Sequence, residues 1–129
     1  MIHEPVILVI EQDKADLNCL LHYLNDLVPG WSVKGPYSTI DCSLEAIHKL
    51  RPKVVFSEYI LKDRSYLELL SAKIQVRFDL VITNHDDRYA LKAIKFGVLD
   101  YLLKPFEKKD LQLTVSRFLN GPYQQSLPD

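Results

Sequence analysis

The chain has little cysteine and no clustered histidine. Among its 129 residues there are two cysteines, Cys19 and Cys42, so a disulfide framework is not expected. Both fall in segments with helical periodicity, and we expect them to be small buried hydrophobic residues. The four histidines are scattered without the spacing typical of zinc ligands, so they predict no metal site.

The chain also has no large excess of one charge and no long hydrophobic run. The 16 basic and 17 acidic residues give a net charge of −1, so we expect no nucleic-acid binding by this domain, because that would need a basic surface. The aliphatic run at 6–10 is far too short to span a bilayer or to form the core of a signal peptide. We therefore expect no membrane association and predict a cytoplasmic location.

Short apolar runs alternate along the chain with segments of helical periodicity. Strands are predicted at 6–10, 31–34, 54–56, 80–83 and 101–103, and helices at about 14–27, 44–50, 65–73, 86–96 and 106–120. Such strand–helix alternation predicts an α/β fold with a doubly wound, five-stranded parallel sheet, and the flavodoxin-like strand order is expected. We assign residues 1–120 to one domain and 121–129 to a tail or the start of a linker.

Polar side chains follow the predicted strands at the points where these end. Glu11 and Gln12 follow the first strand, and Glu58 follows the third. Thr83 closes the fourth strand, and Lys104 follows the fifth. The carboxyl ends of parallel strands meet at one edge of the sheet, where ligands bind in this fold class. We therefore expect these side chains to lie close together.

The stretch 89–106, with Asp100-Tyr-Leu-Leu-Lys-Pro105, resembles the receiver domains of two-component response regulators. It is most similar to receivers that precede LytTR-type DNA-binding domains, and the resemblance runs from Val6 to about Leu119. It implies the (βα)5 receiver fold and a role in signal transduction and transcription regulation. In this family two acids after the first strand hold Mg²⁺, and an Asp after the third strand accepts a phosphoryl group from a histidine kinase.

Three positions match the family's remaining functional residues. By resemblance, Thr83 corresponds to the hydroxyl that grips the phosphoryl oxygens, and Lys104 corresponds to the lysine that does the same. Tyr101 corresponds to the aromatic switch residue three positions before that lysine. These matches imply that the chain keeps the phosphoryl-grip half of a receiver site.

The acidic half of that site departs from the family pattern. Glu58 stands at the phospho-acceptor position, Gln12 at the main metal-binding position, and Glu11 where Asp is usual. A Glu carboxylate lies one methylene, about 1.5 Å, farther from the backbone, and a misplacement of ~1 Å can cost about a hundredfold in rate. We therefore predict a degenerate receiver that is not an enzyme and needs no cofactor. Only Glu11 and Glu58 remain as weak ligands for Mg²⁺.

Two functions stay open at this point. The chain is either a pseudo-receiver that acts through phosphorylation-independent protein contacts, or a conventional receiver that accepts a phosphoryl group with Mg²⁺. A flavodoxin-like cofactor binder is excluded, because the acidic stretch at 11–16 would repel a phosphate. Glu58 itself either forms a structural salt bridge with Lys104, with Thr83 as a hydrogen-bond partner, or mimics the phosphorylated state.

The resemblance also implies partners. In such receivers the face formed by the fourth helix, fifth strand and fifth helix commonly mediates self-association. In this chain that face should include Lys92, Lys95, Tyr101 and residues near Lys108. We therefore expect protein partners, with a homodimer through this face and a sensor histidine kinase as the candidates.

Overall fold

The computed structural model describes residues 4–61, 64–65 and 76–120. Its main sheet is parallel, with the order β2-β1-β3-β6-β7. The strands are β1 (Val6–Ile10), β2 (Ser32–Tyr37), β3 (Val54–Glu58), β6 (Asp79–Asn84) and β7 (Asp100–Leu103), and the helices are α1 (Lys14–Leu27), α2 (Ile40–Leu50), α3 (Ala90–Lys95) and α4 (Lys108–Asn120). The predicted doubly wound sheet with flavodoxin-like strand order is confirmed.

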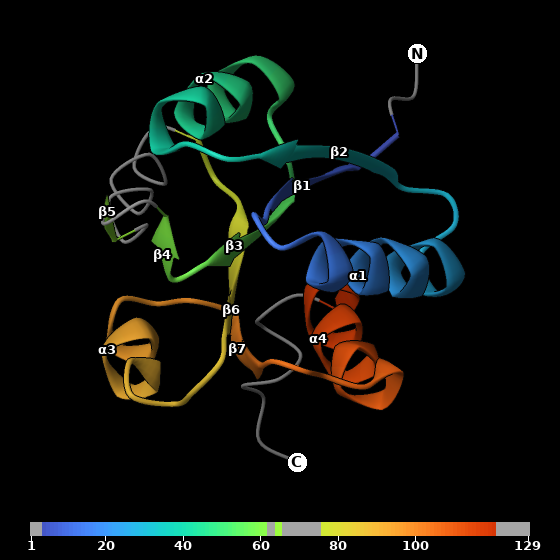
Figure 1. Cartoon of the computed structure of the whole chain (residues 1–129). Coiled ribbons are helices and arrows are strands. Elements are labelled where there is room, and N and C mark those ends of the chain that lie inside the picture. The colour runs from blue at the N-terminus through green and yellow to red at the C-terminus, as the bar shows by residue number, and fades with distance from the viewer. Residues whose placement is uncertain (1–3, 62–63, 66–75, 121–129) are drawn as a thin grey trace.

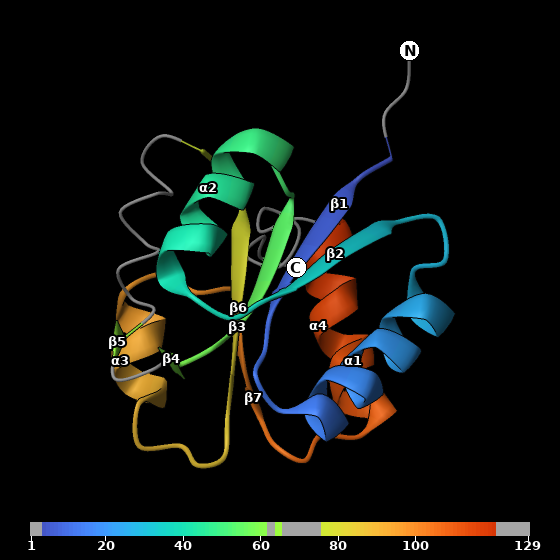
Figure 2. The same ribbon diagram turned by 45° about the horizontal axis from the view of Figure 1, so that its top comes forward.

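The helices cover both faces of the sheet. Figure 1 shows α1 and α4 together on one side and α2 and α3 on the other, and Figure 2 shows the same two layers from another angle. Successive residues of β1 alternate between two apolar cores, with Leu8 and Ile10 facing α2 and α3, and Ile7 and Val9 facing α1 and α4. A strand buried on both faces has no polar alternation, which explains the continuous apolar run.

Helix capping fixes where α1 begins, immediately after β1. The Asp13 side chain accepts a hydrogen bond from the Asp16 backbone N–H at 2.9 Å, as an N-cap residue does. Only Glu11 and Gln12 therefore separate the strand from the cap. This short connection brings the first turn of α1 over the edge of the sheet where the strands end.

The second strand is longer than predicted. We expected a strand at 31–34, but β2 continues through Gly35-Pro36 to Tyr37 with an irregular register against β1. Gly35 has φ of +124°, and a Cβ atom there would lie 2.4 Å from the Val9 carbonyl oxygen. Glycine is thus required by the close approach of β1 and not by a turn.

Other expectations differ in detail. The fourth predicted helix begins only at Ala90, because residues 85–89 form a loop. Two short strands, β4 (Ile60–Leu61) and β5 (Arg64–Ser65), form an additional antiparallel pair that was not predicted. Cys19 is half-buried and Cys42 is exposed, so the expectation of buried cysteines was wrong. Both occupy helix positions outside the apolar stripes.

Part of the sequence prediction lies outside the described residues. This holds for the predicted helix at 65–73, apart from Ser65 in β5, and for the tail at 121–129. Within the described ranges, none of the helices has the length and apolar character needed to cross a membrane.

Candidate functional site

A buried lysine lies among three carboxylates at the edge of the sheet where the strands end. Lys104 Nζ lies 2.8 Å from Glu11 Oε1, 3.2 Å from Asp16 Oδ2 and 3.8 Å from Glu58 Oε1. The side chains of Lys104 and Glu11 are each only 3% exposed. We call these four residues the Lys104 cluster. It joins the ends of β1, β3 and β7 to the first turn of α1.

Glu58 is one of three carboxylates that pair with Lys104. The salt bridge between Glu58 and Lys104 that we gave as one reading of Glu58 is present at 3.8 Å. Glu11 and Asp16 lie nearer to the ammonium than Glu58 does. Glu58 Oε1 also accepts a hydrogen bond from the Gln12 backbone N–H at 2.6 Å. This bond holds the Glu58 carboxylate toward the β1–α1 connection, so that its ion pair with Lys104 is the longest of the three.

The expected hydrogen bond between Glu58 and Thr83 is not found among the described residues. Thr83 is buried at 2% exposure and is the register partner of Glu58 across β3 and β6. The contact between these strands is made by the backbone, since the Tyr59 N–H donates to the Thr83 carbonyl oxygen at 3.3 Å.

Asp16 was missed by the sequence analysis. The acid lies in the first turn of α1, where carboxylates are common because they interact favourably with the helix dipole. That general preference gave no reason to place Asp16 against Lys104. The available signal was its position in the first turn of the helix, three residues after Asp13. Side chains in a helix tilt toward its N-terminus, and this tilt turns Asp16 toward the strand ends.

Burial and neighbouring charge shift two pKa values in the cluster. The pKa of Glu11 is raised from 4.5 to about 7, chiefly by burial and then by the hydrogen bond with Glu58, while Lys104 acts in the opposite direction. Burial acts to lower the pKa of Lys104, but the hydrogen bond and charge of Glu11 outweigh it, so this pKa is raised. The lysine is therefore charged, and Glu11 exchanges its proton near neutral pH.

The cluster does not fit Mg²⁺. A magnesium ion requires oxygen ligands at about 2.0–2.1 Å in near-octahedral geometry. Here the ammonium already lies against Glu11 and Asp16, and Glu58 is engaged by a backbone N–H. The Gln12 residue is exposed. In the part of the chain that the structure describes, no three acidic, histidine or cysteine side chains are arranged to hold a metal ion.

Tyr101 is tied to the loop between β6 and α3. Its hydroxyl donates a hydrogen bond to the Asp86 carbonyl oxygen at 2.8 Å and accepts one from Asn84 Nδ2 at 3.0 Å. Buried Tyr59, which directly follows Glu58, stacks on Tyr89 with ring centroids 4.0 Å apart and an angle of 4° between the rings. Tyr101 and Tyr59 thus hold the loop at 85–89, and the role of Tyr59 was not predicted.

Known proteins similar to this chain include regulators and receiver structures. No protein-family model matches it. Transcriptional regulatory protein BtsR of Salmonella typhi is 30% identical over 115 residues, which cover 86% of this chain and 46% of the relative. Sensory transduction protein LytT of Bacillus cereus is 28% identical over 100 residues, which cover 76% of this chain and 41% of the relative. The chain therefore spans less than half the length of these relatives.

Solved structures decide the family. A two-component response regulator from Clostridium difficile has a TM-score of 0.77 at 25% identity, covering 91% of this chain and 97% of that one. The BeF3-activated DrrB receiver domain has a TM-score of 0.75 at 27% identity, covering 92% of this chain and 100% of that one. The chain is a response-regulator receiver domain. The predicted likeness to receivers of LytTR-type regulators is confirmed.

In this receiver the predicted partner face is formed by α3, β7 and α4. Lys92 and Lys95 are exposed on α3, as predicted. Lys108 lies 3.2 Å from Asp26, so it forms an ion pair between α4 and α1. Exposed hydrophobic side chains that were not singled out lie on all three elements: Leu91, Ile94, Leu103 and Leu113. We call these four residues, with Lys92 and Lys95, the association face.

Proposed function

We propose that this receiver is degenerate and acts in signal transduction and transcription regulation without being phosphorylated. The observation that carries the proposal is the Lys104 cluster, in which the lysine supplies the positive charge that a bound metal would supply. Phosphoryl transfer needs a cation on the transferring group and a free carboxylate nucleophile. Glu58 stands at the acceptor position, and its Oε1 is engaged by the Gln12 N–H.

The proposed role is that of an interaction module in the cytoplasm and not of an enzyme. A sensor histidine kinase is then a docking partner and not a phosphoryl source, and Mg²⁺ has no role. The proposal is supported by the residue types at the acceptor and metal positions, Glu58 and Gln12, and by the engagement of Glu58 and Glu11 described above.

Exposure to a small phosphodonor with Mg²⁺ is expected to leave the mass of the protein unchanged. The double variant Gln12→Asp with Glu58→Asp restores the usual acids at both positions and is expected to gain one phosphoryl group, because shorter carboxylates leave room for a metal. Intact-mass spectrometry measures the mass of the unmodified chain and of the double variant after this treatment. An alkali-labile adduct on the unmodified chain, mapped to Glu58, would overturn the proposal in favour of a conventional receiver.

We further propose that the association face mediates homodimer formation without any phosphodonor. Hydrophobic side chains on α3, β7 and α4 are exposed to solvent, and Leu91, Ile94 and Leu113 are each more than 60% exposed. Glu58 can bias this face through the elements that connect it to α3. Tyr59 stacks on Tyr89 at the start of α3. A bias of only a few kcal/mol is enough to shift such an equilibrium.

Dimerisation is expected to rise with protein concentration and to be weakened by Glu58→Gln, which removes the charge near Lys104 while keeping the shape of the side chain. Glu45→Gln, an equivalent change at an exposed position on α2, is the matched control and should have no effect. Analytical ultracentrifugation up to millimolar protein measures the dissociation constant of the dimer. A monomer throughout would refute the dimer, and a dimer indifferent to Glu58→Gln would leave Glu58 with a structural role only.

A further inference from the structure

Two tyrosine rings connect the end of β3 to the start of α3. Tyr59 directly follows Glu58, the last residue of β3, and is 3% exposed. Its ring is nearly parallel to that of Tyr89, with centroids 4.0 Å apart and an angle of 4° between the planes. Closely packed side chains transmit displacement, so one ring cannot shift without moving the other. We call Tyr59 and Tyr89 the tyrosine stack.

The backbone attaches the two rings of the stack to different elements. The Tyr59 N–H donates to the Thr83 carbonyl oxygen at the end of β6 at 3.3 Å. Tyr89 occupies the N-cap position of α3, and its carbonyl oxygen accepts a hydrogen bond from the Ala93 N–H at 2.9 Å. This is the first hydrogen bond within the helix. The place of the Tyr89 ring therefore determines where α3 begins.

Glu58, at the other end of this connection, is held through its charge. Its Oε1 accepts the Gln12 N–H at 2.6 Å and lies 3.8 Å from Lys104 Nζ. Hydrogen bonds to a carboxylate are about twice as strong as those to a neutral acceptor, so an amide at this position would weaken both contacts. Because Tyr59 is the next residue, the freedom gained at the end of β3 passes directly to the stack.

Tyr101, the other aromatic residue at this loop, is fixed by hydrogen bonds. Its hydroxyl donates to the Asp86 carbonyl oxygen and accepts from Asn84 Nδ2. Arg88 adds to the rigidity of the loop, since its Nε pairs with Asp86 Oδ2 at 3.2 Å and its guanidinium carbon lies 6.0 Å from the centroid of the Tyr89 ring. Tyr101 thus holds the loop in place.

We propose that the tyrosine stack transmits the state of Glu58 to the association face, and that Tyr101 is a fixed latch on the loop at 85–89. The inference rests on the proposed function, in which Glu58 biases that face. Leu91 and Ile94, two of its exposed hydrophobic residues, lie on α3 directly after Tyr89. A shift of the first turn of α3 therefore moves the apolar part of the face as a unit.

Hydrogen exchange at the Ala93 amide, followed by NMR at micromolar protein, reports on the first turn of α3 in the monomer. Glu58→Gln is expected to speed this exchange roughly threefold or more, as for a local opening that becomes easier. With Tyr59→Leu or Tyr89→Leu already present, Glu58→Gln should have no further effect. With Tyr59→Phe, which keeps the ring, or Tyr101→Phe, which leaves the stack intact, the effect should remain.

Two measurements guard against a general loss of stability. Exchange at Ala93 is compared with exchange at the buried Val81 in β6, between β3 and β7, so a change in global unfolding is recognised. Circular dichroism verifies folding. Tyr89 is only half-buried, so Tyr89→Leu tests the stack even where Tyr59→Leu fails to fold.

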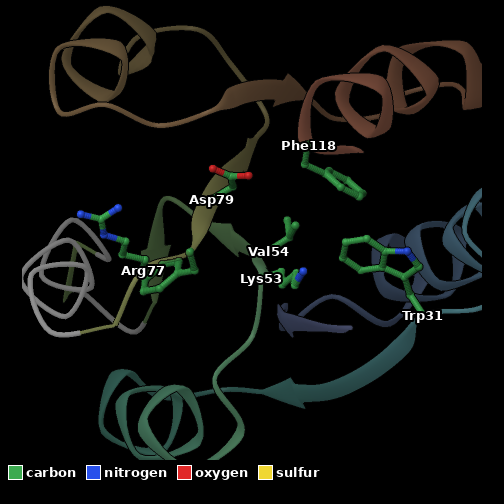
Figure 3. A pocket seen from close by; sticks show the side chains of 7 residues that line it. Trp31, Lys53, Val54, Arg77, Asp79 and Phe118 are labelled. Carbon is green, nitrogen blue, oxygen red and sulfur yellow. The ribbon is translucent and has the colours of Figure 1, made fainter. Parts of the chain in front are cut away.

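Lys53→Gln is the matched control, because it also replaces a charge by an amide next to β3. Figure 3 shows Lys53 and Val54 at a hollow of about 410 Å³ at the edge of the sheet where the strands begin, with the Lys53 side chain pointing toward Trp31. This is the opposite end of β3 from Tyr59. Exchange at Ala93 should therefore be the same as in the unmodified chain.

Three results would overturn the inference. They are no response of Ala93 to Glu58→Gln, an equal response with Tyr89→Leu already present, and loss of the response with Tyr101→Phe. If one of these occurs while ultracentrifugation shows a dimer that Glu58→Gln weakens, the stack is not the route and the proposed function stands. A chain that shows the coupling and yet stays monomeric supports the stack and refutes the dimer.

Discussion

Replacing Lys104 with alanine is expected to lower the free energy of unfolding by about 3 kcal/mol, the lower end of the cost of breaking a buried ion pair. The lysine side chain is 3% exposed and contacts Glu11 at 2.8 Å, so its removal leaves carboxylates facing one another without a cation. Asp16 and Glu58 are 23% and 18% exposed, and their partial solvation keeps the loss from being larger.

Urea denaturation at neutral pH measures this effect, and two variants separate its causes. Lys104→Met keeps most of the aliphatic stem and removes only the charge, so it isolates the electrostatic part of the loss. Lys109→Ala removes a lysine whose ion pair with Glu107 is exposed on both sides, and less than about 1 kcal/mol is expected. If Lys104→Ala left the midpoint of the urea unfolding transition unchanged, the charges of the cluster would be effectively solvated.

The free energy of unfolding is also expected to fall as the pH rises from about 5 to 7. Burial and the hydrogen bond with Glu58 raise the pKa of Glu11 from 4.5 to about 7, so the folded state holds this proton more tightly than the unfolded chain does. The stabilisation is complete below pH 4.5, declines as the unfolded chain loses the proton first, and is gone above about pH 7. The shift corresponds to a loss of about 2–3 kcal/mol across this window.

The variant Glu11→Gln isolates that contribution. It removes the titrating group while keeping the shape of the side chain, so its unfolding free energy should lack this decline. The difference between the two pH profiles cancels the other carboxylates and the histidines, which both proteins share. Profiles that run parallel from pH 5 to 8 would show that Glu11 titrates with an ordinary pKa in the folded receiver.

The composition of the cluster was only partly predictable from sequence. Apolar runs fix the strands, and parallel strands end at one edge, so Glu11, Glu58 and Lys104 could be placed together. Which carboxylate lies nearest to Lys104 could not be predicted. It depends on the backbone N–H of Gln12, which holds Glu58 back, and on the turn of α1 that brings in Asp16. Both are set by tertiary geometry and not by residue type.

The fold shows the same limit. Helical periodicity places α1 correctly, because it is a local property of the sequence. The continuation of β2 past Gly35-Pro36 is not local, since it depends on pairing with β1 across the sheet. Likewise α3 is shorter than its periodicity suggests, because the preceding loop is held by Tyr101 and by the stacking of Tyr59 on Tyr89.

The burial of Lys104 also determines its chemical reactivity. Acylation of a lysine requires a neutral amine that a reagent or acetyltransferase can reach, and Lys104, buried and with a raised pKa, offers neither. Lys92 and Lys95 on α3 are exposed and accessible to such chemistry. The charge balance of the cluster is therefore insulated from lysine acetylation, whereas the charge of the α3 surface is open to it.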